Sequence, residues 1–97
     1  PPYILEEFIK QIVGSGIDHL LIDLPSVDKE NDNGKLLGHR AFWMLDGKLR
    51  MGSTITEMIF VPNSVADGAY FLNLQVAPFE NDAAPSRPLI YEIQGQH

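Results

Sequence analysis

A histidine and a glutamate, His39 and Glu57, are the residues of this sequence whose types and surroundings point most directly to chemistry. Residues 54–61 have the pattern of a β-strand. Strand alternation would place Glu57 on the same face as three large aliphatic residues, Ile55, Ile59 and Val61. A carboxylate on such a face is costly unless it is paired, protonated or bound to a metal ion. The sequence therefore predicts a partner for Glu57.

His39 stands at the head of a predicted helix, after Gly38 and before Arg40. An imidazole nitrogen and a carboxylate oxygen together are a common ligand pair for zinc, manganese or iron, so His39 and Glu57 are candidate metal ligands. The alternative is a helical histidine that makes only a structural hydrogen bond. A catalytic zinc site also needs three protein ligands. The candidates for completing the set, none at a diagnostic spacing, are Asp23, Glu80 and Asp82.

Asp23 and Arg87 are further candidates for the wall of a site. Asp23 lies in the apolar run 19–24, just before a Pro–Ser bend, and carboxylates at strand ends often face a site at the edge of a sheet. Arg87 lies in the polar loop 79–88. The alternatives are an Asp that caps the bend and an exposed loop in which Arg87 pairs with a neighbouring acid. Taken alone, both patterns favour these structural alternatives.

The elements that must position these residues follow from hydrophobic periodicity. Apolar residues at three- and four-residue spacing predict a helix over 3–15, with Pro2 in its first turn, and a second, shorter helix over 36–45. Residues 27–38 read as a solvated connection, without the spacing of an EF-hand loop. Four short apolar or alternating runs predict strands, at 19–24, 54–61, 70–77 and 88–93. The order predicts an α/β domain with a mixed sheet and two helices.

Composition limits the class of protein. The chain has 97 residues, enough for one small domain, and its net charge of −6 with seven scattered basic residues argues against nucleic acid or an anionic membrane as a partner. It has no cysteine, which excludes disulfides and thiol chemistry. No apolar run approaches the ~18 residues of a membrane span, and no signal peptide is visible. We therefore expect a cytoplasmic protein.

Three stretches resemble the cyclase family of metal-dependent hydrolases, which includes bacterial kynurenine formamidase. Residues 16–26 (GIDHLLIDLPS) are similar to the family's strand ending in Asp-Thr-Pro-Ser, with Leu24 in place of the Thr. His39-Arg40, followed by the strand bearing Glu57, resembles the family's His-Arg helix and its Ile-Glu-Asn strand. Residues 71–77 and 80–87 resemble a late strand and an acidic loop ending in Arg. The likeness extends from about residue 3 to residue 93.

The resemblance implies a swivelling β/β/α domain in which the residues matching His39 and Glu57 bind one or two ions, usually zinc or manganese. The ion activates water to cleave an amide, such as an aryl formamide, or a lactone. Two departures accompany the likeness: residues 46–52 look inserted, and the family's main ligand motif, His-x-Gly-Thr-His-x-Asp-x-Pro-x-His, is absent. Because that motif precedes the matching part, we expect residues 1–97 to be the C-terminal portion of one longer hydrolase domain.

Together these patterns predict a metal-dependent amidohydrolase acting on a small-molecule substrate, with His39 and Glu57 as metal ligands and Asp23 and Arg87 in the site wall. The chain by itself is expected to be inactive, because two ligands cannot hold a catalytic ion. It is expected to form a homo-oligomer, since an exposed sheet edge tends to pair. The alternative is a non-catalytic α/β module that serves interaction or regulation.

Overall fold

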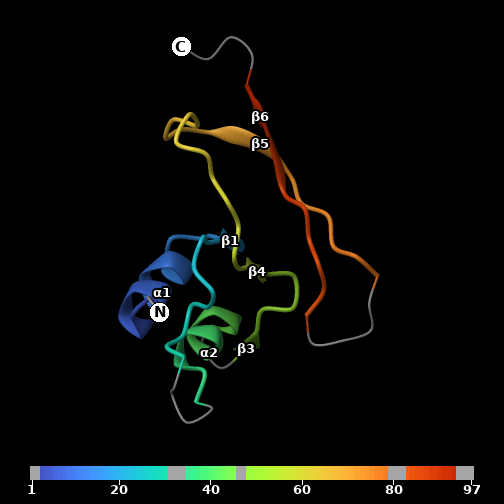
Figure 1. Cartoon of the computed structure of the whole chain (residues 1–97). Helices are drawn as coiled ribbons and strands as arrows, with labels where there is room; N and C mark the ends of the chain where they lie inside the picture. Colours follow the sequence, from blue (N-terminus) through green and yellow to red (C-terminus); the bar gives the residue numbers. More distant parts are fainter. Residues whose placement is uncertain (1–2, 31–34, 46–47, 79–82, 94–97) are drawn as a thin grey trace. The chain divides into compact units, whose positions relative to one another are not determined.

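A computed structural model of the chain describes residues 3–30, 35–45, 48–78 and 83–93 (Figure 1). The predicted mixed α/β class with two helices is confirmed. The prediction of one mixed sheet is wrong, since the described strands form three separate two-stranded pairs, one parallel and two antiparallel. The chain divides into two compact units, Pro1–Phe60 and Val61–His97.

Helix α1 spans Glu6–Gly14, three residues later than the predicted start. The residues before it stay extended because the Ile4 N–H donates a hydrogen bond to the Val27 carbonyl at 2.9 Å. One helix face is buried, as the periodicity predicts, through Ile9 and Val13. The helix ends at a turn in which Gly16 has a φ of +84°, a backbone conformation that glycine adopts without strain. Pro2 lies outside the described residues.

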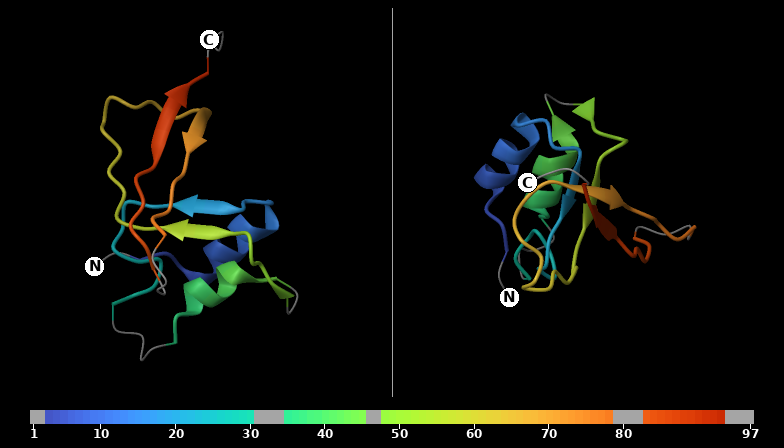
Figure 2. Two further views of the ribbon diagram at one scale, coloured as in Figure 1. Left: turned by 90° about the vertical axis from the view of Figure 1, so that its right-hand side faces the viewer. Right: turned by 90° about the horizontal axis from the view of Figure 1, so that it is seen from above.

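The first unit has one layer of helices on a parallel strand pair. Strand β1, His19–Leu21, pairs in parallel with β4, Thr54–Thr56, and Figure 2 shows α1 and α2 on the same side of this pair. Packing of helices onto the strands buries a small apolar core made of Ile9, Val13, Val27 and Phe42. Val27 belongs to the segment predicted as a solvated connection. That prediction is wrong at this point, because Val27 is fully buried.

Helix α2, Leu37–Trp43, is shorter than the predicted 36–45, because the chain turns at Trp43 into a hairpin formed by β2, Met44–Leu45, and β3, Lys48–Leu49. Arg50 stabilises the turn between α2 and this hairpin. Its guanidinium donates hydrogen bonds to the carbonyls of Phe42 and Ile17, both at 2.6 Å, and lies over the Phe42 ring. Residues 46 and 47, which begin the segment that looks inserted, lie outside the described residues.

The predicted strand 54–61 is wrong beyond Thr56. Met58 has a φ of +60°, in the left-handed region, so the backbone bends directly after Glu57 and the two-residue alternation stops. The bent chain still pairs with the segment after β1, because the Met58 N–H donates to the Leu24 carbonyl at 2.9 Å. Glu57 therefore lies at the end of a strand pair, not in the middle of an aliphatic face.

The second unit contains an antiparallel hairpin of β5, Tyr70–Asn73, and β6, Leu89–Glu92. These strands confirm two predicted elements, although β5 ends before residue 77 and only a single bridge, Val76 with Ser86, continues the pairing. Exposed apolar side chains occur in both units, but among the described residues only the first unit also has fully or almost fully buried ones, Ile9, Val13, Val27 and Phe42. No helix in the described residues is long and apolar enough to cross a membrane.

Candidate histidine–carboxylate site

The first unit brings together three ionisable side chains from separate parts of the sequence: Asp28, His39 and Glu57. Asp28 lies in the chain after β1, His39 in the first turn of α2, and Glu57 just after β4. The buried Val27 anchors the first of these segments in the core, while α2 and β4 pack around the same core. Core packing therefore determines how closely the three side chains approach.

Asp28 is buried and accepts hydrogen bonds on both carboxylate oxygens. Its Oδ1 accepts from the Gly38 N–H at 2.5 Å, and its Oδ2 accepts from the His39 N–H at 3.0 Å and lies 2.6 Å from His39 Nδ1. The carboxylate thus caps the first turn of α2. Only glycine fits at position 38 without a shift, since a Cβ there would lie 2.9 Å from Oδ1.

The hydrogen bonds around Asp28 favour its ionised form. Burial by itself would raise the pKa of this carboxyl. The hydrogen bonds from the His39 ring and from the Gly38 and His39 amides, together with the charge of the imidazole, outweigh burial and hold the pKa below its ordinary value. Asp28 is therefore a carboxylate at neutral pH.

His39 presents one ring nitrogen to each carboxylate. Nδ1 is bound to Asp28, and Nε2 lies 3.7 Å from Glu57 Oε2. The ring also stacks on Trp43, one helical turn later, with a centroid distance of 5.7 Å and an interplanar angle of 25°. Two independent contacts therefore fix the orientation of the imidazole.

Glu57 has the partners that an acid among apolar residues requires. The Val27 N–H donates to its Oε2 at 2.9 Å, and this same oxygen faces His39 Nε2. Both side chains keep some exposure, 27% for Glu57 and 20% for His39, whereas Asp28 keeps 8%. Asp28 is thus the most buried member of the cluster, and His39 and Glu57 are its partly exposed members.

The donor atoms of His39 and Glu57 fit one divalent ion in type and separation. Two atoms that bind a tetrahedral zinc ion at about 2.1 Å each lie about 3.4 Å apart, close to the observed 3.7 Å. Asp28 cannot join them, because its oxygens bind the opposite side of the ring. Within the described part of the chain, no three His, Cys, Asp or Glu residues form a group that could hold a metal ion.

Of the other predicted site residues, Asp23 belongs to the first unit and Arg87 to the second. Asp23 is exposed, and no hydrogen bond or ion pair among the described residues joins it to His39 or Glu57. Arg87 is exposed as well. Glu80 and Asp82 lie outside the described residues.

Asp28 is the member that sequence reasoning missed. It sits in an acidic, turn-rich segment whose composition is typical of a solvated loop. The one local signal is Gly38 before His39, since a glycine at a helix start can mark a close approach by another group. That signal does not tell which carboxylate of the chain approaches the glycine.

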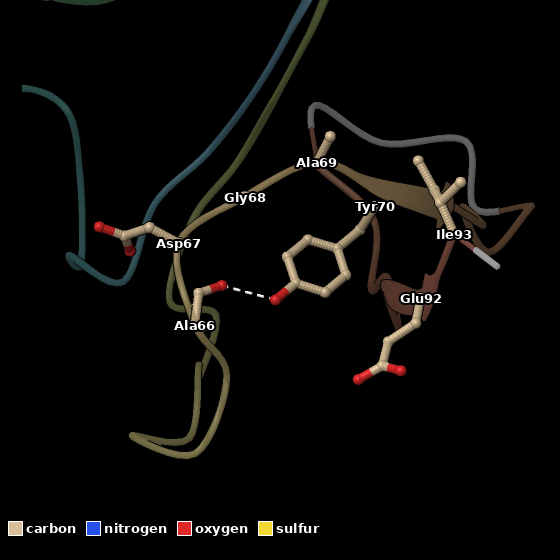
Figure 3. Close-up of a pocket in the computed structure, with 7 residues that line it drawn as sticks. All are labelled: Ala66, Asp67, Gly68, Ala69, Tyr70, Glu92 and Ile93. Carbon is tan, nitrogen blue, oxygen red and sulfur yellow. Dashed lines mark hydrogen bonds between the residues drawn. The ribbon is translucent and has the colours of Figure 1, made fainter. Parts of the chain in front are cut away.

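The second unit has a pocket of about 420 Å³, bounded by the approach to β5 and the end of β6 (Figure 3). The Tyr70 hydroxyl donates to the Ala66 carbonyl at 2.5 Å across its wall. Figure 3 shows the carboxylates of Asp67 and Glu92 on different sides of the Tyr70 ring. They do not converge on a common point, so this pocket lacks the arrangement seen around His39.

Comparison with known proteins gives no match: no protein-family model, no curated protein and no solved structure is similar to the chain at a significant level.

Proposed function

We propose that this chain contributes two metal ligands, His39 Nε2 and Glu57 Oε2, to a metal-dependent hydrolase that cleaves a C–N amide bond of a small molecule. The observation that carries the proposal is the 3.7 Å separation of these two atoms, which belong to the two partly exposed side chains of the cluster. Zinc and manganese are the ions that this donor pair suits. The sequence resemblance to cyclase-type hydrolases supports the reaction class and an aryl formamide as the kind of substrate.

The roles of the residues follow from their places in the cluster. A divalent ion held there would supply Lewis-acid polarisation of the substrate carbonyl and a more acidic water. His39 and Glu57 would hold the ion, and the Val27 N–H would orient the glutamate. We propose that the remaining ligands come from residues outside the described part of this chain, as the cyclase-type domain implies. Asp23 and Arg87 stay predictions for the site wall.

Metal binding by the purified chain tests the ligand assignment. Zinc and manganese are titrated calorimetrically into the wild type, His39→Ala and Glu57→Gln, with elemental analysis of each protein. Glu57→Gln retains an amide oxygen that can accept the Val27 N–H, so the backbone contact can survive while the carboxylate is lost. We expect weak binding in the wild type and a loss of about 10-fold or more in each variant.

His19→Ala is the matched control, because His19 is an exposed histidine of the same unit whose Nδ1 bonds only to the Thr54 hydroxyl. Its metal affinity should equal that of the wild type. Equal binding by all four proteins, or none by any of them, would contradict the ligand assignment and favour a non-catalytic module. Hydrolysis of an N-aryl formamide by the full-length protein, with and without His39→Ala, tests the reaction class.

A further inference from the structure

We propose that Asp28 is a positioning residue: it fixes His39 in the tautomer with the proton on Nδ1, so that the lone pair of Nε2 faces Glu57 and the ion between them. This inference rests on the proposed function for its purpose, but its geometry is independent of any metal. It assigns a role to a residue that neither periodicity nor the resemblance singled out.

The distances favour one arrangement of the imidazole proton. Nδ1 lies 2.6 Å from Asp28 Oδ2, within hydrogen-bond range, whereas Nε2 lies 3.7 Å from Glu57 Oε2, beyond it. A carboxylate oxygen can only accept, so a neutral imidazole must place its hydrogen on Nδ1 to make the shorter contact. Nε2 is then left with a free lone pair that faces Glu57.

Asp28 is itself held in place. Its two oxygens accept three hydrogen bonds, from the Gly38 N–H, the His39 N–H and His39 Nδ1, and its own N–H donates to the Ser26 hydroxyl at 3.1 Å. A buried acceptor with this many donors cannot rotate without breaking several of them. The orientation of the imidazole therefore follows from the backbone at the start of α2.

A carboxylate behind the imidazole serves metal binding in a general way. Histidines that bind metal ions usually donate their second N–H to a carboxylate or carbonyl, which sets the tautomer and raises the basicity of the ligating nitrogen. Asp28 has this position relative to His39, and Trp43 stacks on the ring to restrict its remaining freedom. Loss of such a carboxylate typically weakens metal binding about 10–100-fold.

Asp28→Ala is the informative substitution because it removes both acceptor oxygens from the cluster. Without an acceptor at position 28 the proton is no longer held on Nδ1, so the tautomer equilibrium should move toward the form in which Nε2 carries the proton. Asp28→Asn is the matched comparison, because it keeps the size of the side chain and one acceptor oxygen. That oxygen can face the two donors of His39 while the NH₂ group faces Gly38, so this variant can keep the tautomer of the wild type.

Nitrogen-15 NMR of the imidazole reads the tautomer directly in the metal-free chain, at a pH where the spectrum shows His39 neutral. His39→Ala assigns its signals against those of the other two histidines. In the wild type we expect protonation on Nδ1, and in Asp28→Ala a shift toward Nε2 and a zinc affinity that is about 10–100-fold weaker. His19 serves as the internal control, and its tautomer should be the same in both proteins.

A wild-type His39 protonated on Nε2 would overturn the inference. An unchanged tautomer in Asp28→Ala, with the far-UV circular dichroism of the wild type, would also overturn it. If the tautomer behaves as expected but neither zinc nor manganese binds any form, the positioning by Asp28 stands and the ligand assignment of the proposed function fails.

Discussion

The two units of the chain use similar apolar residues in different ways. The first unit buries Phe42 and its neighbours and, next to them, Asp28. In the second, no described residue is buried, and Phe71, Val76 and Tyr91 are more than half exposed. A two-stranded hairpin is only marginally stable by itself in water. The comparison teaches that the candidate site depends on a core, because hydrogen bonds hold a polar cluster rigid only where water is excluded.

The largest expected difference is between the two phenylalanines. Phe42→Ala should lower the free energy of unfolding by about 3–5 kcal/mol, because it empties a fully buried position. Phe71→Ala removes a side chain that is 62% exposed and should change stability by about 0.5 kcal/mol or less. Urea denaturation, followed by Trp43 fluorescence and by circular dichroism, measures both. Equal losses would refute the contrast between the units.

An arginine from each unit gives the second comparison. Arg50→Ala should destabilise the first unit by about 2–3 kcal/mol, since the charged hydrogen bonds to the Phe42 and Ile17 carbonyls are lost. Its ion pair with the exposed Asp18 contributes little. Arg87→Ala in the second unit should be nearly neutral. Arg50→Lys should recover only part of the loss, because one ammonium group does not reproduce the two-pronged donor. Full recovery in the same denaturation assay would show that charge alone matters.

A glycine from each unit gives the third comparison. Gly38→Ala should destabilise the first unit by about 1–3 kcal/mol, because its Cβ would lie 2.9 Å from Asp28 Oδ1. At Gly68, in the second unit, a Cβ would meet only a Tyr70 ring carbon at 3.9 Å. Gly68→Ala should therefore be tolerated. Thermal unfolding of the two variants decides the matter, and a stable Gly38→Ala protein would mean that the carboxylate is not held tightly.

The smallest expected effect is a dependence of stability on pH. The pKa of Asp28 is lower in the folded chain than its unfolded value of about 3.9, so its carboxylate contributes stability that is fully present above that value. The contribution is lost as the pH falls through the folded pKa. Denaturation midpoints between pH 7 and pH 3 should fall more steeply for the wild type than for Asp28→Asn. Parallel curves would contradict the hydrogen bonding described here.

Much of the fold could be predicted from local pattern, since helix periodicity and strand alternation depend on residues close in sequence. Helix α1, helix α2 and the strands β5 and β6 lie inside their predicted segments. The errors occur where backbone contacts between distant segments determine where a helix or strand begins or ends. The Val27 carbonyl delays the start of α1, and the left-handed Met58 ends β4 early. Neither effect can be recognised from the spacing of the hydrophobic residues in the sequence.

The sequence by itself predicted the α/β class and singled out His39 and Glu57, whose side chains do face each other. The aliphatic strand face from which a partner for Glu57 was inferred does not form, because β4 ends at Thr56. Only the tertiary structure decided that Asp28 stands behind the histidine. Composition makes its segment look solvated, and what buries it is the packing of Val27 into a core formed by residues far away in the chain. Side chains meet through such packing, and a sequence read locally contains no distances between segments.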